Sequence, residues 1–430
     1  MVDDARAVGQ EVEDRQAPST FGSRLKYVGP GLVVAATGVG AGDMVSSLSA
    51  GTQFGTVLIW AVVFGALLKY VLTEGLGRWY MATGTTILKA WKSLGLWATL
   101  YFGIYLLIVT FAFGAAGASA PALATTAMFP DVMPLWAWAM LHGIAGFVIV
   151  GIGRYHLFER VMEVFVGLMF VTVVGLAIMV APAGTLGELA LGTVVPRIPE
   201  GAMINVLAII GGVGGTFTLA SYPYWVRERG WHRPAWIPTM RTDIGVGYLI
   251  TGIFMVAMLV VGAELLFASG SDIAGEEGLI ALSKPIEERF GALASWFFLI
   301  GFWAAAASSI VGAWNGGAYL FADFVRTLRN VPDERAEEYL SEKSVWFRGF
   351  LVWITFPPML LLAFQQPVYL VIIYAALGSL FMPFLAITLL WLLNRRVPPA
   401  YRNGIIVNIL LAVCVLVFVV LGVREIIDMF

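Results

Sequence analysis

The first apolar stretch, residues 29–51 (GPGLVVAATGVGAGDMVSSLSAG), is long and apolar enough to enter a bilayer, yet its centre does not favour a continuous helix. Gly38, Gly40 and Gly42 lie close together, and each glycine inside a helix costs about 1 kcal/mol relative to alanine. Unwound backbone persists in hydrocarbon only where protein buries it or where it lines a polar cavity. Asp43 follows the last glycine, and an acidic side chain at this depth indicates a functional site. The stretch therefore predicts two half-helices that meet at a binding site.

A second apolar stretch repeats this pattern. Residues 207–226 (LAIIGGVGGTFTLASYPYWV) contain glycine pairs at 211–212 and 214–215, followed, as in the first stretch, by hydroxyl side chains and small residues. Counted along the chain, the two stretches are the first and sixth spans. Gly-interrupted spans at corresponding positions of two halves indicate the site of a secondary transporter. The alternative is that the glycines only allow close packing of helices, as small residues do in membranes.

The composition identifies the class of protein. Hydrophobic residues make up 59% of the 430 residues and charged residues 13%, whereas a soluble domain has about 25% charged residues. We therefore expect an all-α membrane protein, in which each span needs about 20 apolar residues. The single cysteine, Cys414, excludes an internal disulfide and a thiolate metal cluster. Eleven spans are found, at roughly 29–51, 55–77, 97–127, 134–152, 160–182, 203–226, 243–267, 292–325, 348–365, 367–393 and 404–423.

Lysine and arginine are distributed unequally among the connecting segments. With the N-terminus inside, most of them fall in inner segments, and the outer side contains only Arg197, Lys284, Arg289 and Arg424. Because cytoplasmic loops carry the excess of positive charge, we expect a cytoplasmic N-terminus and an extracytoplasmic C-terminus in a bacterial inner (plasma) membrane. Residues 1–27 are expected to form a disordered cytoplasmic tail, and residues 28–424 a single transporter domain.

Several short motifs resemble those of the Nramp divalent-metal transporters. They are GPG at 29–31, AG after the first break, ATG at 82–84, the glycine-led sixth span, ASSIVGAWNGG at 307–317 and MPF at 382–384. The resemblance covers about residues 27–424. It implies the APC/Nramp-type fold of that family, with inverted five-helix repeats at about 28–182 and 203–393 and an extra helix at 404–423. It also implies a site between broken helices 1 and 6.

The metal-binding motifs of that family are not retained in this sequence. The motif of helix 1 is DPGN, and the same positions here, 40–43, read GAGD. The motif of helix 6 is MPH, where a gap-free alignment places TLA (218–220) and a shift by three residues places SYP (221–223). Neither alignment supplies the methionine thioether, which favours transition metals, or the histidine associated with proton handling.

The residues that remain near the two breaks supply oxygen donors. Such donors suit a hard cation such as Mg²⁺, which keeps part of its hydration shell, better than a soft transition metal. Asp43 is the candidate metal ligand, although it also stands where it can cap the second half-helix by accepting from backbone amides. The candidate substrate-binding residues are Asp43, Thr37, Gly38, Gly40, Gly215, Thr216, Thr218 and Tyr222.

Two further groups of polar residues lie in apolar spans. Ser308 and Ser309 match the hydroxyl pair with which sodium-coupled relatives of the wider fold hold Na⁺ against helix 1 carbonyls. Serines also join membrane helices by ordinary hydrogen bonds, so packing is the alternative for this pair. Lys69, Glu74 and Asp243 lie near the inner ends of their spans, where we expect ion pairing or snorkelling.

Three functions fit these observations. The leading hypothesis is an Nramp-like secondary-active transporter that moves a cation by alternating access and favours hard divalent, Mg²⁺-like ions over transition metals. The second is a transporter of a small organic solute, coupled to Na⁺ through Ser308 and Ser309. The third is a receptor-like or scaffold membrane protein that no longer transports.

Neither an enzyme nor a cofactor is expected, because no nucleophile–base–acid set and no glycine-rich phosphate loop is found in the sequence. The expected partners are the transported ion or solute and the lipid bilayer. Nucleic acid is not among them, and the sequence leaves the oligomeric state open.

Overall fold

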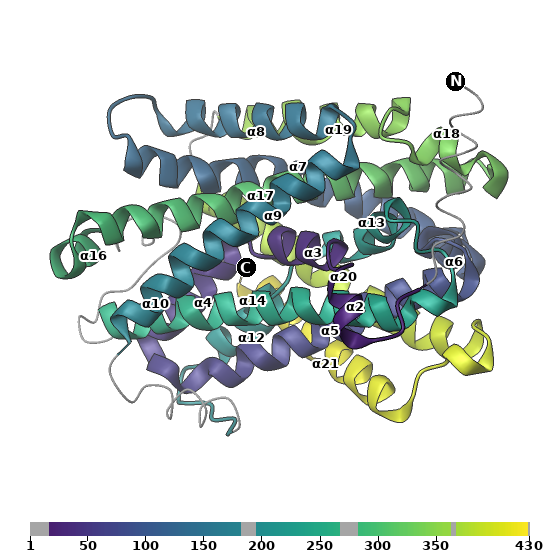
Figure 1. Cartoon of the computed structure of the whole chain (residues 1–430), viewed down its shortest axis with the longest axis horizontal. Coiled ribbons are helices and arrows are strands. Elements are labelled where there is room, and N and C mark those ends of the chain that lie inside the picture. Colours follow the sequence, from purple (N-terminus) through teal and green to yellow (C-terminus); the bar gives the residue numbers. More distant parts are fainter. Residues whose placement is uncertain (1–16, 182–194, 267–282, 363–366, 429–430) are drawn as a thin grey trace.

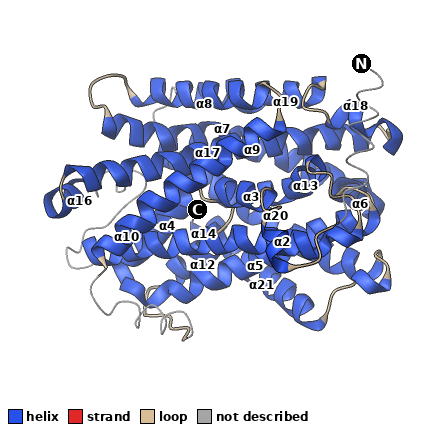
Figure 2. Ribbon diagram, in the orientation of Figure 1, coloured by secondary structure: helices blue, strands red, loops and turns tan. Residues whose placement is uncertain are grey.

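The computed structural model describes residues 17–181, 195–266, 283–362 and 367–428. Every regular element within these ranges is helical, as Figure 2 shows. Seven helices in these ranges are long and apolar enough to cross a membrane, and three more apolar helices are shorter. The predicted all-α membrane fold is therefore confirmed.

The eleven predicted spans correspond to helices in the same order. The two glycine-rich spans are each divided, into α3 (Pro30–Gly38) and α4 (Ala41–Phe54), and into α12 (Met203–Gly212) and α13 (Tyr222–Glu228). The predicted ends at 182, 267 and 363–365 lie outside the described residues. The remaining spans are α5 (Ile59–Thr83), α7 (Leu96–Met128), α8 (Leu135–Gly151), α9 (Tyr155–Met169) with a π-helical turn η2 (Phe170–Val174) and α10 (Gly175–Val180), α14 (Ile237–Leu266), α17 (Ala292–Leu328), α19 (Val345–Leu362), α20 (Pro367–Arg395) and α21 (Ile405–Asp428).

Short helices connect or precede these spans. Three of them, α6, α16 and α18, come directly before or shortly before the long helices α7, α17 and α19. The 3-10 turn η1 follows α4, and the 3-10 turn η3 follows the second break. Their bounds are α2 (Phe21–Leu25), η1 (Gly55–Leu58), α6 (Ile87–Leu94), η3 (Phe217–Ser221), η4 (Pro234–Trp236), α16 (Ser283–Phe290), η6 (Asp333–Arg335), α18 (Ala336–Leu340) and η7 (Pro399–Tyr401).

The divided spans occupy the centre of the molecule. Helix α14 packs along α3, α4 and α5, whereas α17 packs against α3, α7 and α9. Figure 1 shows α3 between the α17–α7 pair and the α14–α5 pair, with α8 and α19 on the far side of α7. Because α12 contacts both α4 and α5, the second divided span joins this central layer. The functional positions predicted at the two breaks therefore lie inside the bundle, away from lipid.

The glycines produce both breaks for identifiable reasons. Helix α3 ends at Gly38 and α4 starts at Ala41, so the first break is short. At the second break Gly214 and Gly215 have φ values of +84° and +80°, a region that glycine adopts without steric cost. A Cβ placed on Gly38 would lie 2.6 Å from the carbonyl carbon of Gly214. The two breaks therefore lie in direct backbone contact, which requires glycine on the α3 side.

The N-terminal tail is more ordered than the sequence predicted. Residues 1–16 lie outside the described residues, but Phe21–Leu25 form helix α2. The Thr20 hydroxyl accepts from the Ser23 backbone N–H and the Ser23 side chain accepts from the Thr20 N–H, a reciprocal cap that stabilises a helix start. Because α2 also packs on α14, the predicted disorder of residues 1–27 does not hold for residues 21–25.

The contact between the breaks generates a stability prediction. Gly38→Ala is expected to destabilise the protein by about 1–3 kcal/mol, because the new methyl group would overlap backbone atoms that have no rotamer to move into. Gly167→Ala in α9 is the matched control, since a Cβ there meets no atom within 4 Å. The measurement is the temperature at which each purified variant loses its monodisperse peak in detergent. Equal temperatures for the two variants would contradict the close approach.

Candidate functional site

The carboxylate of Asp43 lies between the two breaks. Its Oδ2 accepts from the Gly40 backbone N–H at 3.0 Å, so the capping role considered from the sequence is present. Its Oδ1 faces the other break, because a Cβ on Gly212 would lie only 2.8 Å from it. One half-buried side chain therefore closes the start of α4 and contacts the end of α12. The geometry is compatible with a ligand role for the same carboxylate.

The three candidate threonines point in different directions. The Thr37 hydroxyl donates to the Val33 carbonyl at 2.6 Å and packs against Gly312 of α17, away from the second break. Thr216 contacts α20, since a Cβ on Gly378 would lie 3.0 Å from its Cγ2. Thr218 Oγ1 lies close to Gly215, where a Cβ would approach it to 2.8 Å. The Thr218 hydroxyl therefore lies beside a glycine of the second break.

Tyr222 belongs to a different part of the structure. It is the first residue of α13, is fully buried, and donates its hydroxyl to Asp243 Oδ2 of α14 at 2.8 Å. The other oxygen of Asp243 accepts from the Gly29 N–H, at the start of α3, at 2.9 Å. The structure therefore places Tyr222 beside the beginning of α3, whereas Gly38, Gly40, Asp43, Gly215 and Thr218 lie together at the breaks.

Ser308 and Ser309 of α17 contact the end of α3. Ser308 Oγ donates to the Ala36 carbonyl at 2.8 Å, and Ser309 Oγ donates to the Thr37 carbonyl at 3.2 Å. Both serines are buried. This is the pairing of hydroxyls with helix 1 carbonyls that the sodium hypothesis requires, and the same hydrogen bonds join α17 to α3.

Lys69 is the residue of this region that sequence reasoning missed. We predicted that it snorkels or pairs near the inner end of its span, but its Nζ donates to the carbonyls of Gly211 (3.1 Å) and Gly215, and its exposed fraction is 0%. That prediction was wrong because the unwound backbone of the second break reaches α5 in mid-helix. The sequence feature that could have indicated this buried position is that the lysine lies inside the apolar run 58–73.

Glu74 follows the sequence prediction of an ion pair, whereas Asp243 does not, because its fully buried carboxylate is bound by a backbone N–H and a tyrosine hydroxyl in place of a cation. Glu74 accepts from Arg78 at 3.1 Å and from Arg241 at 2.9 Å, so it is paired as expected. Asp243 is fully buried and bound by Gly29 and Tyr222 as described above. Both carboxylates lie away from the breaks and join helices at the end of the bundle where α3 begins.

The beginning of α3 is held by residues of three other helices, which we call the α3 clamp: Asp243, Tyr222, Glu159 and Arg229. Arg229 directly follows α13 and donates to Glu159 of α9 at 2.9 Å. This ion pair packs closely against Gly29. A Cβ on Gly29 would lie 2.3 Å from Glu159 Oε1 and 2.4 Å from an Arg229 nitrogen. In this conformation the clamp fixes α3 against α9, α13 and α14.

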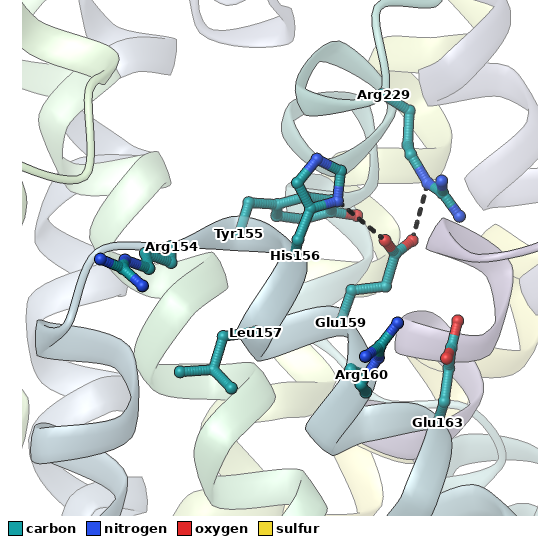
Figure 3. A pocket seen from close by; sticks show the side chains of 8 residues that line it. All are labelled: Arg154, Tyr155, His156, Leu157, Glu159, Arg160, Glu163 and Arg229. Atoms are coloured by element: carbon teal, nitrogen blue, oxygen red, sulfur yellow. Dashed lines mark hydrogen bonds and ion pairs between the residues drawn. The ribbon is translucent and has the colours of Figure 1, made fainter.

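A surface cavity of about 690 Å³ adjoins the clamp. Figure 3 shows Glu159 between His156 and Arg229, with Arg160 and Glu163 below it and Arg154 directed away. The lining residues are Arg154, Tyr155, His156, Leu157, Glu159, Arg160, Glu163 and Arg229. Positive and negative side chains alternate here, so the cavity has no single charge and its Glu159–Arg229 pair belongs to the clamp.

The described residues contain no group of three or more His, Cys, Asp or Glu side chains arranged to hold a metal ion. Any cation at the breaks would therefore depend on Asp43 together with hydroxyl and carbonyl oxygens or water.

Two broken helices crossing at the centre of two inverted five-helix repeats, with an eleventh helix added, define a membrane transporter. Residues 31–428 match the family described as natural resistance-associated macrophage protein-like, or Nramp. The chain belongs to the Nramp family and is an integral membrane protein.

Relatives and solved structures agree with this assignment. The chain is 28% identical over 325 residues to the "Divalent metal cation transporter MntH" of Mycobacterium tuberculosis, covering 72% of each protein. It is 25% identical over 333 residues to the protein of the same name from Chromohalobacter salexigens, covering 72% of this chain and 75% of the relative.

The fold resembles that of the manganese transporter of Eremococcus coleocola, with a TM-score of 0.76 at 15% identity over 96% of this chain and 89% of that one. It is less similar to MhsT crystallised with L-phenylalanine, with a TM-score of 0.53 at 15% identity over 97% of this chain and 100% of that one. At these identities the likeness concerns the fold alone.

The α3 clamp generates a prediction about mobility. Glu159→Gln removes the charge that pairs with Arg229 and is expected to loosen the start of α3. A loss of roughly 1–2 kcal/mol changes an equilibrium by a factor of 5–30. The measurement is the maleimide labelling rate of Val34→Cys, a buried α3 position, in a chain whose one native cysteine is also buried.

Glu163→Gln is the matched control, because Glu163 lines the same cavity and lies outside the clamp. We expect this variant to label at the wild-type rate. Equal labelling rates in Glu159→Gln and Glu163→Gln would mean that the ion pair does not hold α3.

Proposed function

We propose that this protein is a secondary-active transporter that moves a metal cation across the membrane by alternating access. The observation that carries the proposal is the position of the Asp43 carboxylate, which stands at the first break and faces Gly212 of the second. Relatives bear the name divalent metal cation transporter, and a manganese transporter has a similar fold. An intramembrane carboxylate beside unwound backbone is the usual arrangement of an ion site in such proteins.

The cation that we propose is a hard, Mg²⁺-like divalent ion. The thioether and imidazole of the family motif are replaced in this sequence by residues that offer only oxygen. Oxygen ligands favour Mg²⁺ over softer metals, and Mg²⁺ usually keeps several of its waters. One carboxylate with few direct ligands therefore suits an ion that is bound partly hydrated.

The orientation that we propose follows from the distribution of positive charge. Most lysine and arginine residues fall in the segments on the side of the N-terminus. This supports a cytoplasmic N-terminus and an extracytoplasmic C-terminus. In that orientation the α3 clamp closes the cytoplasmic end of the pathway, and its release opens the site to the cytoplasm.

A flux assay tests the proposed site. Purified protein in liposomes is expected to take up Mg²⁺ and Mn²⁺, and Asp43→Ala is expected to lower uptake of both by at least about tenfold, equivalent to about 1.4 kcal/mol. Glu264→Gln, which changes a partly buried carboxylate near the end of α14, is the control and keeps wild-type uptake. Unchanged uptake in Asp43→Ala would reject the assignment of Asp43.

A second candidate function is Na⁺-coupled transport of a small organic solute. It is favoured by the contacts of Ser308 and Ser309 with the carbonyls of residues 36 and 37, which bring four oxygens to the end of α3. The C-terminal end of a half-helix attracts a cation, and unwound carbonyls coordinate Na⁺ in transporters of this architecture.

Sodium dependence separates the two candidates. If Na⁺ binds at the two serines, replacing external Na⁺ with choline slows wild-type uptake severalfold, and Ser308→Ala shows the slow rate in both media. Ser119→Ala is the control, because the Ser119 hydroxyl bonds only within its own helix, to the Ala115 carbonyl. Uptake that does not respond to Na⁺ would remove the sodium hypothesis, and a lack of flux for every solute and ion would favour the non-transporting alternative.

A further inference from the structure

Lys69 brings an amino group to the second break. Its side chain extends from α5, is completely buried, and donates from Nζ to the carbonyls of Gly211 and Gly215. The aromatic face of Phe418, from α21, lies 5.4 Å from the same nitrogen. Helices far apart in sequence therefore surround one ammonium group.

The carbonyls that Lys69 occupies are those a cation would otherwise use. Gly211 lies in the last turn of α12, and Gly215 lies in the unwound segment that follows. Carbonyls at the end of a helix lack intrahelical partners and carry the negative end of the helix dipole. An ammonium group donates up to three hydrogen bonds and is attracted to aromatic faces. Lys69 thus satisfies the end of α12 as a bound cation would.

Asp43 approaches the same segment from the other side. A Cβ on Gly212 would lie 2.8 Å from the Asp43 carboxylate, whereas a Cβ on Gly214 would lie 3.6 Å from Lys69 Cβ. The backbone of residues 212–215 therefore has both the Asp43 carboxylate and the Lys69 side chain as neighbours.

We propose that Lys69 is a resident cation that determines the charge specificity of the transport site. Its ammonium fills the carbonyl end of α12 and repels an arriving cation, so that a divalent ion binds weakly at Asp43. This inference rests on the proposed function, because it concerns the same site. Repulsion between charges in a protein interior extends over several ångströms and grows with the charge of the ion.

The test is the affinity of purified full-length protein for MgCl₂ and MnCl₂, measured by isothermal titration calorimetry. Lys69→Gln removes the charge and keeps an amide that can donate to the two carbonyls. We expect it to bind both ions at least about tenfold more tightly than the wild type, because one repelling charge is lost. The gain is expected to be similar for Mg²⁺ and Mn²⁺, since repulsion depends on charge and not on ligand softness.

Two control variants separate charge from structure. Lys69→Arg keeps the positive charge and is expected to keep the weak affinity of the wild type. Lys92→Gln removes a lysine that bonds to the Thr327 carbonyl and the Asn330 side chain, outside the site, and is also expected to leave affinity unchanged. A purely structural role of Lys69 predicts weaker binding in Lys69→Gln, which would overturn the inference.

A variant at another position tests the same inference if the Lys69 variants fail to fold. Cys414 lies one helical turn before Phe418 on α21, and the Phe418 ring faces the Lys69 nitrogen. Cys414→Asp therefore places a compensating negative charge beside an intact Lys69, and the same rise in affinity is expected. Unchanged or lower affinity in a folded Cys414→Asp protein would again overturn the inference.

The outcomes also distinguish this inference from the proposed function. Loss of binding in Asp43→Ala, together with unchanged affinity in Lys69→Gln, overturns only the role of Lys69. Absence of Mg²⁺ and Mn²⁺ binding in both the wild type and Lys69→Gln overturns the proposed function and this inference together.

Discussion

Backbone that leaves the helix inside a membrane needs hydrogen-bonding partners from the protein, and this requirement shapes the centre of the molecule. At the first break the hydroxyls of Ser308 and Ser309 cover the last carbonyls of α3, and Asp43 closes the start of α4. At the second break Lys69 covers carbonyls at the end of α12. Helices α5 and α17 therefore supply the side chains that two unwound segments require.

The same glycines that open the helices also bring the openings together. Gly214 and Gly215 adopt the left-handed conformation, and Gly38 approaches them without a side chain between. A polar residue on one break is consequently within reach of the other, as the contact of Asp43 with Gly212 illustrates. The candidate site is thus formed by both breaks together. The α3 clamp contacts the start of α3, the helix that leads into the first break.

This protein has the architecture of the Nramp family, but its residues at the two breaks differ from the metal-binding motifs of that family. The positions of the family's DPGN and MPH motifs read GAGD and TLA in a gap-free alignment. Among the described residues, Asp43 supplies a carboxylate to the first break and Lys69 donates to carbonyls of the second. A site that combines one negative and one positive side chain differs physically from a site built to bind a transition metal through several protein ligands.

The sequence by itself determined the number and order of the spans and the two breaks, because apolar length and helix-breaking glycines act within a few residues. For Asp43 it offered a helix cap and a metal ligand as alternatives, and the structure contains the cap. Only the tertiary structure decided that Tyr222 lies at the start of α3 and that Lys69 lies at the second break. Both depend on contacts between distant segments, such as that between residues 69 and 211, and no local pattern encodes which helix an unwound carbonyl will face. For the same reason the predicted snorkelling of Lys69 failed, whereas the pairing of Glu74 with Arg78, one helical turn away, succeeded.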